Sequence, residues 1–203
     1  MPDPFRTEYY DAEAPAYDAT RGGPARAAAA AVAVLSLVPR AGVCVDVAGG
    51  TGIVSAALAA RGLDVLVVDR STGMLGIAGG RLPGRVLAAD ADRLPFANGS
   101  VDLVTMIWLL HLVPGEADQI IAEAARVLRP SGSFVTTVDK DLAHGTTRRT
   151  DADERGRVGS VLAGFGLELT ATTSFRGETR WTRGDGGPQV FHVAAFRRPR
   201  AVD

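Results

Sequence analysis

A short apolar run that ends in a glycine-rich turn constrains this chain more than any other stretch. Residues 43–47 are apolar and mostly β-branched except at Asp46, as expected for a strand buried on both faces. Gly49, Gly50 and Gly52 follow, and their missing side chains let a ligand approach the backbone closely. A predicted helix over 52–61 directs its free N–H groups toward the same point. The stretch therefore predicts a strand, a nucleotide-binding turn and a helix.

Length and composition indicate a single globular domain with a sizeable core, since the chain has 203 residues of which 46% are hydrophobic. No run approaches the roughly 18 apolar residues of a membrane span. The net charge of −1 provides no electrostatic footprint for nucleic acid or a membrane surface. Cys44 is the single cysteine, so no internal disulfide forms, and residues 1–6 lack the apolar core of a secretory signal. We expect a cytoplasmic protein, monomeric or homodimeric, without a nucleic-acid or membrane partner.

Strand and helix patterns alternate along most of the chain. Predicted strands cover 43–47, 64–68, 85–89, 101–106 and 133–138, and predicted helices cover 24–38, 52–61, 71–81, 116–128 and 153–164. Because no tight hairpin turn joins these strands, the pattern predicts a parallel sheet with right-handed crossovers. Two further β-rich runs, 167–175 and 190–196, flank a glycine-rich turn at 184–187 and predict a terminal hairpin. The fold class is α/β: a doubly wound, mostly parallel seven-stranded sheet with an antiparallel C-terminal hairpin and helices on both faces.

The first 23 residues are predicted to form an arm, separate from a single domain over 24–203. The arm carries three tyrosines, Tyr9, Tyr10 and Tyr17. Pro15 interrupts its helical pattern, because proline removes a backbone N–H and clashes with the preceding turn. We therefore predict a short helix followed by an irregular segment.

Carboxylates accompany three successive predicted strands. Asp46 lies within the first strand, Asp69 follows the second, and Asp90 and Asp92 follow the third. The carboxyl ends of parallel strands meet at one crevice, where ligands bind in sheets of this kind. The sequence therefore predicts an acidic crevice beside the glycine-rich turn.

The acidic crevice separates two classes of nucleotide ligand. A dinucleotide loop requires the pattern G-x-G-x-x-G, and Ser55 stands here in place of the third glycine. A pyrophosphate would also be repelled, since like charges about 4 Å apart cost roughly 4 kcal/mol at an intermediate dielectric. S-Adenosylmethionine carries a sulfonium and an ammonium group and would be attracted. Asp69 suits either ligand, because both have ribose hydroxyls, whereas Asp46 favours S-adenosylmethionine.

Five ordered motifs resemble those of the class I S-adenosylmethionine-dependent methyltransferases. They are residues 45–52 (VDVAGGTG), 68–75 (VDRSTGML), 89–96 (ADADRLPF), 99–104 (GSVDLV) and 125–133 (ARVLRPSGS). Residues 10–18 (YDAEAPAYD) are similar to the N-terminal lid of the branch related to ubiquinone and menaquinone methyltransferases. The resemblance implies a Rossmann-like fold, S-adenosylmethionine as cofactor, and O-, N- or C-methylation of a small organic molecule, such as a step of specialised metabolism.

The resemblance also implies which residues hold the cofactor. Gly50 and Gly52 would pass beneath the methionine part, with Asp46 on its ammonium side, and Asp69 would accept hydrogen bonds from the ribose hydroxyls. Asp90 would accept from the adenine amino group. In the lid, Tyr17 would close over the methionine end and Arg21 would pair with its carboxylate. The implied cofactor residues are Tyr17, Arg21, Asp46, Ala48, Gly49, Gly50, Gly52, Asp69, Arg70, Met74, Asp90, Ala91 and Asp92.

One position in the turn departs from the family pattern. Ala48 stands where the family usually has glycine. If the backbone at this position has a positive φ, alanine strains the turn by about 1 kcal/mol. The cofactor would then bind more weakly.

Fewer sequence features indicate which residues bind the methyl acceptor. Candidate substrate residues are Tyr9, Tyr10, Trp108, His111 and His144. His111 is also the candidate general base, because imidazole titrates near neutrality, although a histidine bonded within a loop is the plainer interpretation. No metal is expected, since Asp139 and Asp141 form only part of a ligand set. Two other functions stay open: a cofactor-binding protein that does not transfer methyl groups, and a nicotinamide oxidoreductase.

Overall fold

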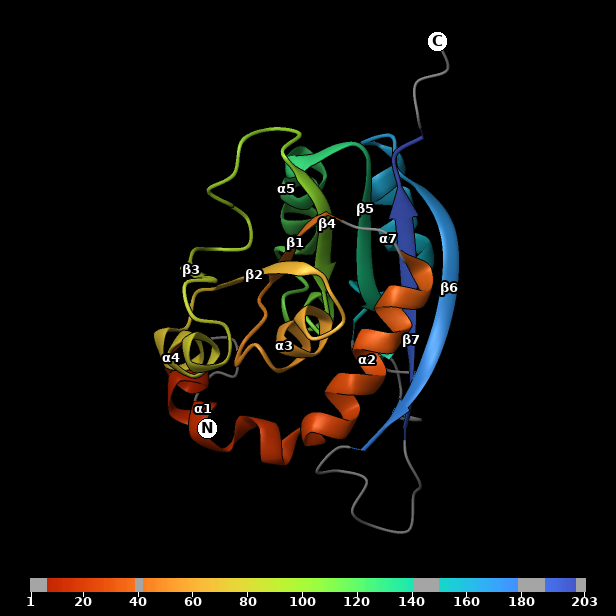
Figure 1. Ribbon diagram of the computed structural model, residues 1–203. Helices are drawn as coiled ribbons and strands as arrows, with labels where there is room; N and C mark the ends of the chain where they lie inside the picture. The colour runs from red at the N-terminus through yellow and green to blue at the C-terminus, as the bar shows by residue number, and fades with distance from the viewer. Residues whose placement is uncertain (1–6, 39–41, 141–149, 179–188, 200–203) are drawn as a thin grey trace.

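A seven-stranded sheet forms the centre of the computed structural model, which describes residues 7–38, 42–140, 150–178 and 189–199 (Figure 1). The strand order is β3-β2-β1-β4-β5-β7-β6. Neighbours among β1 to β5 are parallel, whereas β7 is antiparallel to both β5 and β6. This confirms the predicted α/β fold class. The strands are β1 (Val43–Val47), β2 (Asp64–Asp69), β3 (Val86–Ala88), β4 (Val101–Met106), β5 (Leu128–Val138), β6 (Glu168–Gly177) and β7 (Gln189–Arg197).

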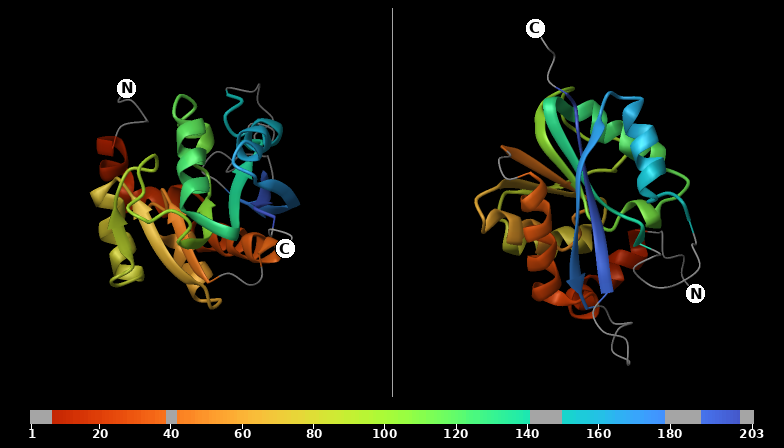
Figure 2. Two further views of the ribbon diagram at one scale, coloured as in Figure 1. Left: turned by 90° about the horizontal axis from the view of Figure 1, so that it is seen from above. Right: turned by 90° about the vertical axis from the view of Figure 1, so that its right-hand side faces the viewer.

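Helices cover both faces of the sheet, as Figure 2 shows. One apolar cluster joins α2 and α3 to Cys44 of β1, and another joins α5 and α7 to Val45 and Val47 of the same strand. Alternate residues of β1 thus face opposite layers, which is the two-residue period of a strand. The helices are α1 (Thr7–Thr20), α2 (Gly23–Leu37), α3 (Ile53–Ala59), α4 (Thr72–Arg81), the short 3-10 helix η1 (Leu110–Leu112), α5 (Ala117–Val127) and α7 (Arg155–Ala163).

The N-terminal arm is one helix, so the predicted break at Pro15 is wrong. α1 runs through Pro15 from Thr7 to Thr20 and packs against α4. The carboxylate of Asp11 accepts hydrogen bonds from Ser71 Oγ at 2.6 Å and from the Gly73 N–H at 2.8 Å. These contacts cap the start of α4 and anchor α1. Docking on α4 offsets the hydrogen bond that a proline within a helix forfeits.

The start of β5 differs from the prediction, and the predicted terminal turn falls outside the described residues. β5 begins at Leu128, immediately after α5, instead of at residue 133. Leu128 pairs with Val101 and Ser133 pairs with Leu103, so the intervening residues of β5 form a bulge that sequence patterning read as a loop. The predicted turn at 184–187 lies outside the described residues. Within the ranges described, no helix has the length and apolar character needed to cross a membrane.

Candidate functional site

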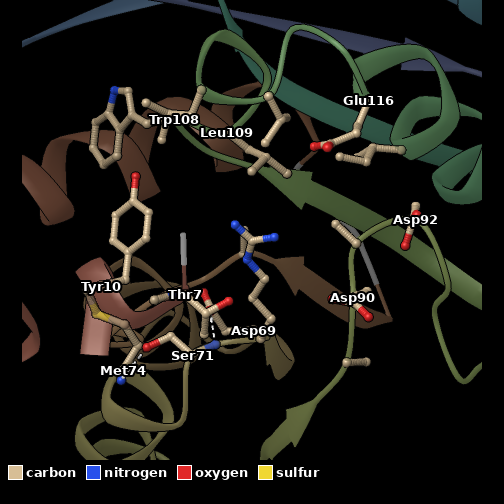
Figure 3. A pocket seen from close by; sticks show the side chains of 18 of the residues that line it. Thr7, Tyr10, Asp69, Ser71, Met74, Asp90, Asp92, Trp108, Leu109 and Glu116 are labelled. Carbon is tan, nitrogen blue, oxygen red and sulfur yellow. Dashed lines mark hydrogen bonds between the residues drawn. The ribbon is translucent and has the colours of Figure 1, made fainter. Parts of the chain in front are cut away.

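A cavity of about 560 Å³ lies at the carboxyl ends of the first strands, roofed in part by α1 (Figure 3). Its volume is typical of pockets that bury a small-molecule ligand. The glycine-rich turn contributes Ala48 and Gly50, and the segment after β4 contributes Trp108. Asp90 and Asp92 lie across the cavity from Tyr10 and Trp108. The cavity therefore has an acidic end and an aromatic end.

Most of the predicted cofactor residues line this cavity. From β2 and α4 come Asp69, Arg70 and Met74. The segment after β3 supplies Asp90, Ala91 and Asp92, and α1 supplies Tyr17. Segments predicted from separate motifs are thus brought to one wall, because the carboxyl ends of parallel strands share an edge of the sheet.

The turn after β1 has a left-handed backbone, which is the condition under which Ala48 was expected to be strained. Ala48 has φ +54°, Gly50 has φ +57° and Gly52 has φ +69°. An alanine in this region is strained by about 1 kcal/mol relative to an unstrained conformation. A side chain at Gly50 would point toward the sulfur of Met74, another residue of the wall, so glycine keeps this part of the cavity open.

Asp69 joins the glycine-rich turn to the start of α4. One carboxylate oxygen accepts a hydrogen bond from the Gly50 N–H at 2.9 Å, and the other accepts from the Ser71 N–H at 2.8 Å. Burial raises the pKa of Asp69, although these backbone hydrogen bonds act in the opposite direction. Each carboxylate oxygen retains acceptor capacity. Asp69 can therefore bind hydroxyl donors within the cavity.

Asp46 lies beneath the turn and does not line the cavity, so its predicted role on the ammonium side of the cofactor stays a prediction. It is only 2% exposed and accepts hydrogen bonds from Thr105 Oγ1, at 2.7 Å, and from Ser55 Oγ. A Cβ added at Gly49 would stand 2.9 Å from the Asp46 carboxylate, so the turn rests directly on this group. Burial raises the pKa of Asp46 to about 6. Asp46 thus supports the turn from below, on the side of β1 that faces α3.

Four other predicted residues lie outside the wall. Gly49 packs on Asp46, and Gly52 precedes the first turn of α3. Arg21 Nη2 pairs with a carboxylate oxygen of Glu13 at 3.1 Å, and its guanidinium stands 5.1 Å from the centre of the Tyr17 ring. Tyr9 contacts the Tyr10 ring edge-to-face, with ring centroids 5.3 Å apart. Of the two adjacent tyrosines, only Tyr10 lines the cavity.

Trp108, a candidate substrate residue, lines the cavity and also packs against other aromatic rings. Its backbone has φ +64°, a conformation that costs energy for a bulky residue. The Trp108 N–H donates to Thr137 Oγ1 at 2.7 Å, which fixes the segment to β5. Its ring contacts Phe175 and Phe191 edge-to-face, with centroids 6.1 Å and 5.6 Å away.

The two histidines predicted near the acceptor, His111 and His144, are not among the described residues that line the cavity. His111 lies in η1, and its Nε2 accepts a hydrogen bond from Lys140 Nζ. His111 does not line the cavity, although Leu112 and Val113 beside it do. His144 lies outside the described residues. The role of His111 as a base stays a prediction.

One apolar part of the cavity wall was not predicted from the sequence. It comprises Leu109, Leu112, Val113 and Ile120, with Glu116 between the last two, from the segment after β4 and the start of α5. The signal was the apolar run at 109–113, which reads equally well as core. Within the described parts of the chain, no group of three or more His, Cys, Asp or Glu side chains is arranged to hold a metal ion.

Comparison with known proteins shows what this chain is similar to. Residues 45–136 match a family model described as a methyltransferase domain. A demethylmenaquinone methyltransferase from Renibacterium salmoninarum is 39% identical over 143 residues, which are 68% of this chain and 58% of that relative. Residues 45–136 therefore carry a methyltransferase domain. This confirms the resemblance carried by the ordered motifs.

The chain spans about half the length of the curated relatives it matches. It spans 58% of the Renibacterium protein, and 38% and 42% of two further demethylmenaquinone methyltransferases. What those longer proteins act on is therefore not transferred to this chain by the match alone.

Solved structures share the fold of this chain at low sequence identity. The [4+2]-cyclase SpnF superposes with a TM-score of 0.73, at 18% identity over 96% of each chain. Geranyl diphosphate C-methyltransferase from Streptomyces coelicolor A3(2), solved with S-adenosyl-L-homocysteine, superposes with a TM-score of 0.64 at 17% identity, covering 84% of this chain and 78% of that one. SpnF is named as a cyclase and the second protein as a methyltransferase, so the shared fold does not by itself determine the reaction.

Proposed function

We propose that this protein transfers the methyl group of S-adenosylmethionine to a small organic acceptor, at oxygen, nitrogen or carbon. The observation that carries the proposal is the position of Asp69. Its carboxylate bridges the glycine-rich turn and α4 at the floor of a cavity whose walls come from four separate motifs. The family match supports the same conclusion.

The residues present fit S-adenosylmethionine. Gly50 has no side chain to fill the cavity, and Asp69 has free acceptor capacity for the ribose hydroxyls. Asp90 would accept from an adenine amino group and Ala91 would contact the adenine, and both residues line the cavity. When bound, the cofactor supplies a methyl group already activated by its sulfonium.

The chain contributes positioning and exclusion of water. Holding two reactants in a productive geometry is worth about 7–11 kcal/mol of the barrier. Tyr10 and Tyr17 of α1 and Trp108 of the loop after β4 enclose the aromatic end, where an acceptor has to approach. We propose that residues 1–23 act as a lid on the domain formed by residues 24–203, because α1 supplies this part of the wall.

A general base is needed only for an acceptor that loses a proton as it attacks. His111 is the candidate from the sequence, and its position one residue from the wall supports a role near the acceptor. Its Nε2 is engaged by Lys140, so proton uptake there requires that contact to change.

We further propose a cytoplasmic protein, monomeric or homodimeric, without a nucleic-acid partner. The net charge of −1 supports the last point, since nucleic-acid binding relies on a basic surface.

Calorimetry with S-adenosylhomocysteine, S-adenosylmethionine and NADPH tests the cofactor. We expect the first two to bind and NADPH to give no signal; the reverse order would make the protein an oxidoreductase. Incubation with S-[methyl-14C]adenosylmethionine and a panel of carboxylic, phenolic and amine acceptors then tests transfer. Tight cofactor binding without label in any acceptor would favour a binding protein that does not catalyse transfer.

A further inference from the structure

A long irregular loop carries part of the cavity wall. Residues 89–100 connect β3 to β4 and form neither helix nor strand (Figure 1). Connections in compact domains usually have about 4–6 residues, so this one is unusually long. Its first residues line the cavity, among them Asp90, Ala91 and Asp92. Whatever holds this loop therefore decides where these residues lie in the cavity.

The contacts of the Asp90 side chain do not fix its position. The side chain is 53% exposed, and Arg93 Nη2, on a side chain that is 86% exposed, stands 3.9 Å from its carboxylate. Ion pairs between exposed groups contribute little to structure. The position of Asp90 in the cavity wall therefore depends on the course of the loop backbone.

Two side chains of α5 hold the next part of the loop. We define the loop clamp as Glu123 and Arg126, which lie one helical turn apart. The Glu123 carboxylate accepts a hydrogen bond from the Leu94 N–H at 2.6 Å. Arg126 donates from Nη2 to the Leu94 carbonyl at 3.0 Å and from Nη1 to the Phe96 carbonyl at 2.9 Å. The loop clamp thus supplies partners for backbone groups that regular secondary structure would otherwise pair.

The two members of the loop clamp orient each other. Arg126 Nε and Nη2 donate to the two oxygens of the Glu123 carboxylate, each at 2.7 Å. A bidentate pair of this kind fixes the plane of the guanidinium, which a lysine ammonium cannot reproduce. The hydrogen bond from Arg126 lowers the pKa of Glu123, so the carboxylate is ionised at neutral pH.

The contacts of the loop clamp lead back to the cavity. Leu94 is 3% exposed and belongs to the same apolar cluster as Ile120, which lines the cavity from α5. Directly before Leu94, the Arg93 N–H donates to the Asp90 carbonyl at 3.1 Å and closes a turn. A shift of Leu94 would therefore be passed to Asp90 through this turn.

We propose that Glu123 and Arg126 are positioning residues for the cofactor: they hold the loop so that Asp90 can accept a hydrogen bond from the adenine amino group. This rests on the proposed function, which gives Asp90 that contact. Neither member of the loop clamp is among the described residues that line the cavity, so both act through the loop.

The test separates recognition of the amino group from cofactor binding in general. The probes are S-adenosylhomocysteine and S-inosylhomocysteine, in which a carbonyl oxygen replaces the 6-amino group. Calorimetry gives the ratio of the two affinities for the full chain as wild type, Asp90→Ala, Arg126→Met and Glu123→Ala. Arg157→Met is the matched control, because Arg157 also pairs with a carboxylate of α5, that of Asp118, and its side chain is 34% exposed, as is that of Arg126.

We expect the wild type to prefer S-adenosylhomocysteine about tenfold or more, the effect of one charge-assisted hydrogen bond. The preference should fall to about threefold or less in Asp90→Ala, Arg126→Met and Glu123→Ala, and Arg157→Met should keep the wild-type value. Combining Arg126→Met with Asp90→Ala should lower the preference no further than Asp90→Ala alone, because both changes act on one contact.

A general loss of structure would weaken both probes equally and leave the ratio unchanged. An unchanged ratio in Arg126→Met would therefore overturn the proposal, and Glu123→Ala decides in its place if Arg126→Met does not fold. A wild type that binds both probes equally would overturn it as well, since Asp90 would then contact no amino group. In these cases S-adenosylhomocysteine still binds, whereas its failure to bind the wild type would refute the proposed function itself.

Discussion

The carboxylate of Asp69 accepts a hydrogen bond from the N–H of Gly50, 19 residues earlier, at 2.9 Å. Two motifs that are separate in the sequence therefore form one element of the cavity floor. The same carboxylate holds the first N–H of the segment leading into α4, so it is oriented before any ligand arrives. Preorganised acceptors of this kind bind hydroxyl donors at low entropic cost.

Asp69→Ala should weaken S-adenosylhomocysteine about 100-fold, because charge-assisted hydrogen bonds to two ribose hydroxyls are lost. Calorimetry measures the change. Asp64→Ala is the control, since Asp64 begins the same strand at the opposite end and is half exposed. Unchanged affinity in Asp69→Ala would refute the placement of the ribose.

Ala48→Gly should raise the free energy of unfolding by about 0.5–1 kcal/mol. Alanine at φ +54° is strained, and glycine relieves that strain at the cost of a more flexible unfolded chain. Urea denaturation is the measurement. Ala57→Gly, within α3, is the matched control and should lower stability by about 1 kcal/mol. Equal losses in both variants would show that position 48 is unstrained.

Asp46 should make the protein less stable as pH rises from about 4 to 6. The folded pKa of about 6 lies above the usual 3.8, so the folded state binds the proton more tightly and loses that advantage as the group ionises. The difference corresponds to roughly 3 kcal/mol, complete above the folded pKa. Asp46→Asn keeps an acceptor for Ser55 and Thr105 but does not titrate.

The measurement for Asp46 is the free energy of unfolding of both forms at pH 4, 5, 6 and 7. The wild type should lose stability relative to Asp46→Asn across this range. Parallel curves for the two proteins would contradict the raised pKa.

The contacts of Asp18 should stabilise the packing of α1 over the glycine-rich turn. Its carboxylate accepts a hydrogen bond from Thr51 Oγ1 at 2.6 Å and pairs with Arg81 Nη2 at 2.5 Å, which connects α1 directly to the glycine-rich turn. Asp18→Ala should speed amide hydrogen exchange across residues 7–20. Glu8→Ala, on an exposed position of the same helix, should leave exchange unchanged. Slow exchange in both variants would mean that the contacts of Asp11 hold α1 on their own.

His111→Ala should leave S-adenosylhomocysteine affinity unchanged and slow methyl transfer less than tenfold. A general base contributes about 10²–10⁴-fold, but the Nε2 of His111 accepts a hydrogen bond from Lys140. Initial rates are measured with any acceptor that the wild type methylates, and Lys140→Ala serves as the companion variant. A loss of 100-fold or more in His111→Ala would establish the base predicted from the sequence.

Local sequence patterns were sufficient to predict the sheet and many of the residues that line the cavity. β1 has the predicted bounds, and Ser71, the first residue of the helix predicted over 71–81, is the N-cap of α4. Asp69 and Asp90 follow strands whose carboxyl ends meet, so their convergence in the cavity follows from the parallel topology alone. The strain of Ala48 at a positive φ could also be stated in advance, because positive φ is a property of a tight turn.

Packing between distant segments decided the rest. Asp46 reads as a strand-end carboxylate, but Ser55 and Thr105 enclose it beneath the turn. The helix through Pro15 depends on α4, and the course of the loop after β3 depends on Glu123 and Arg126 of α5. The sequence by itself determined which residues form strands, turns and caps, because those depend on near neighbours. Which face of a strand meets the ligand, and which side chains hold a loop in place, was decided only by the tertiary structure, since both depend on side chains contributed from elsewhere in the chain.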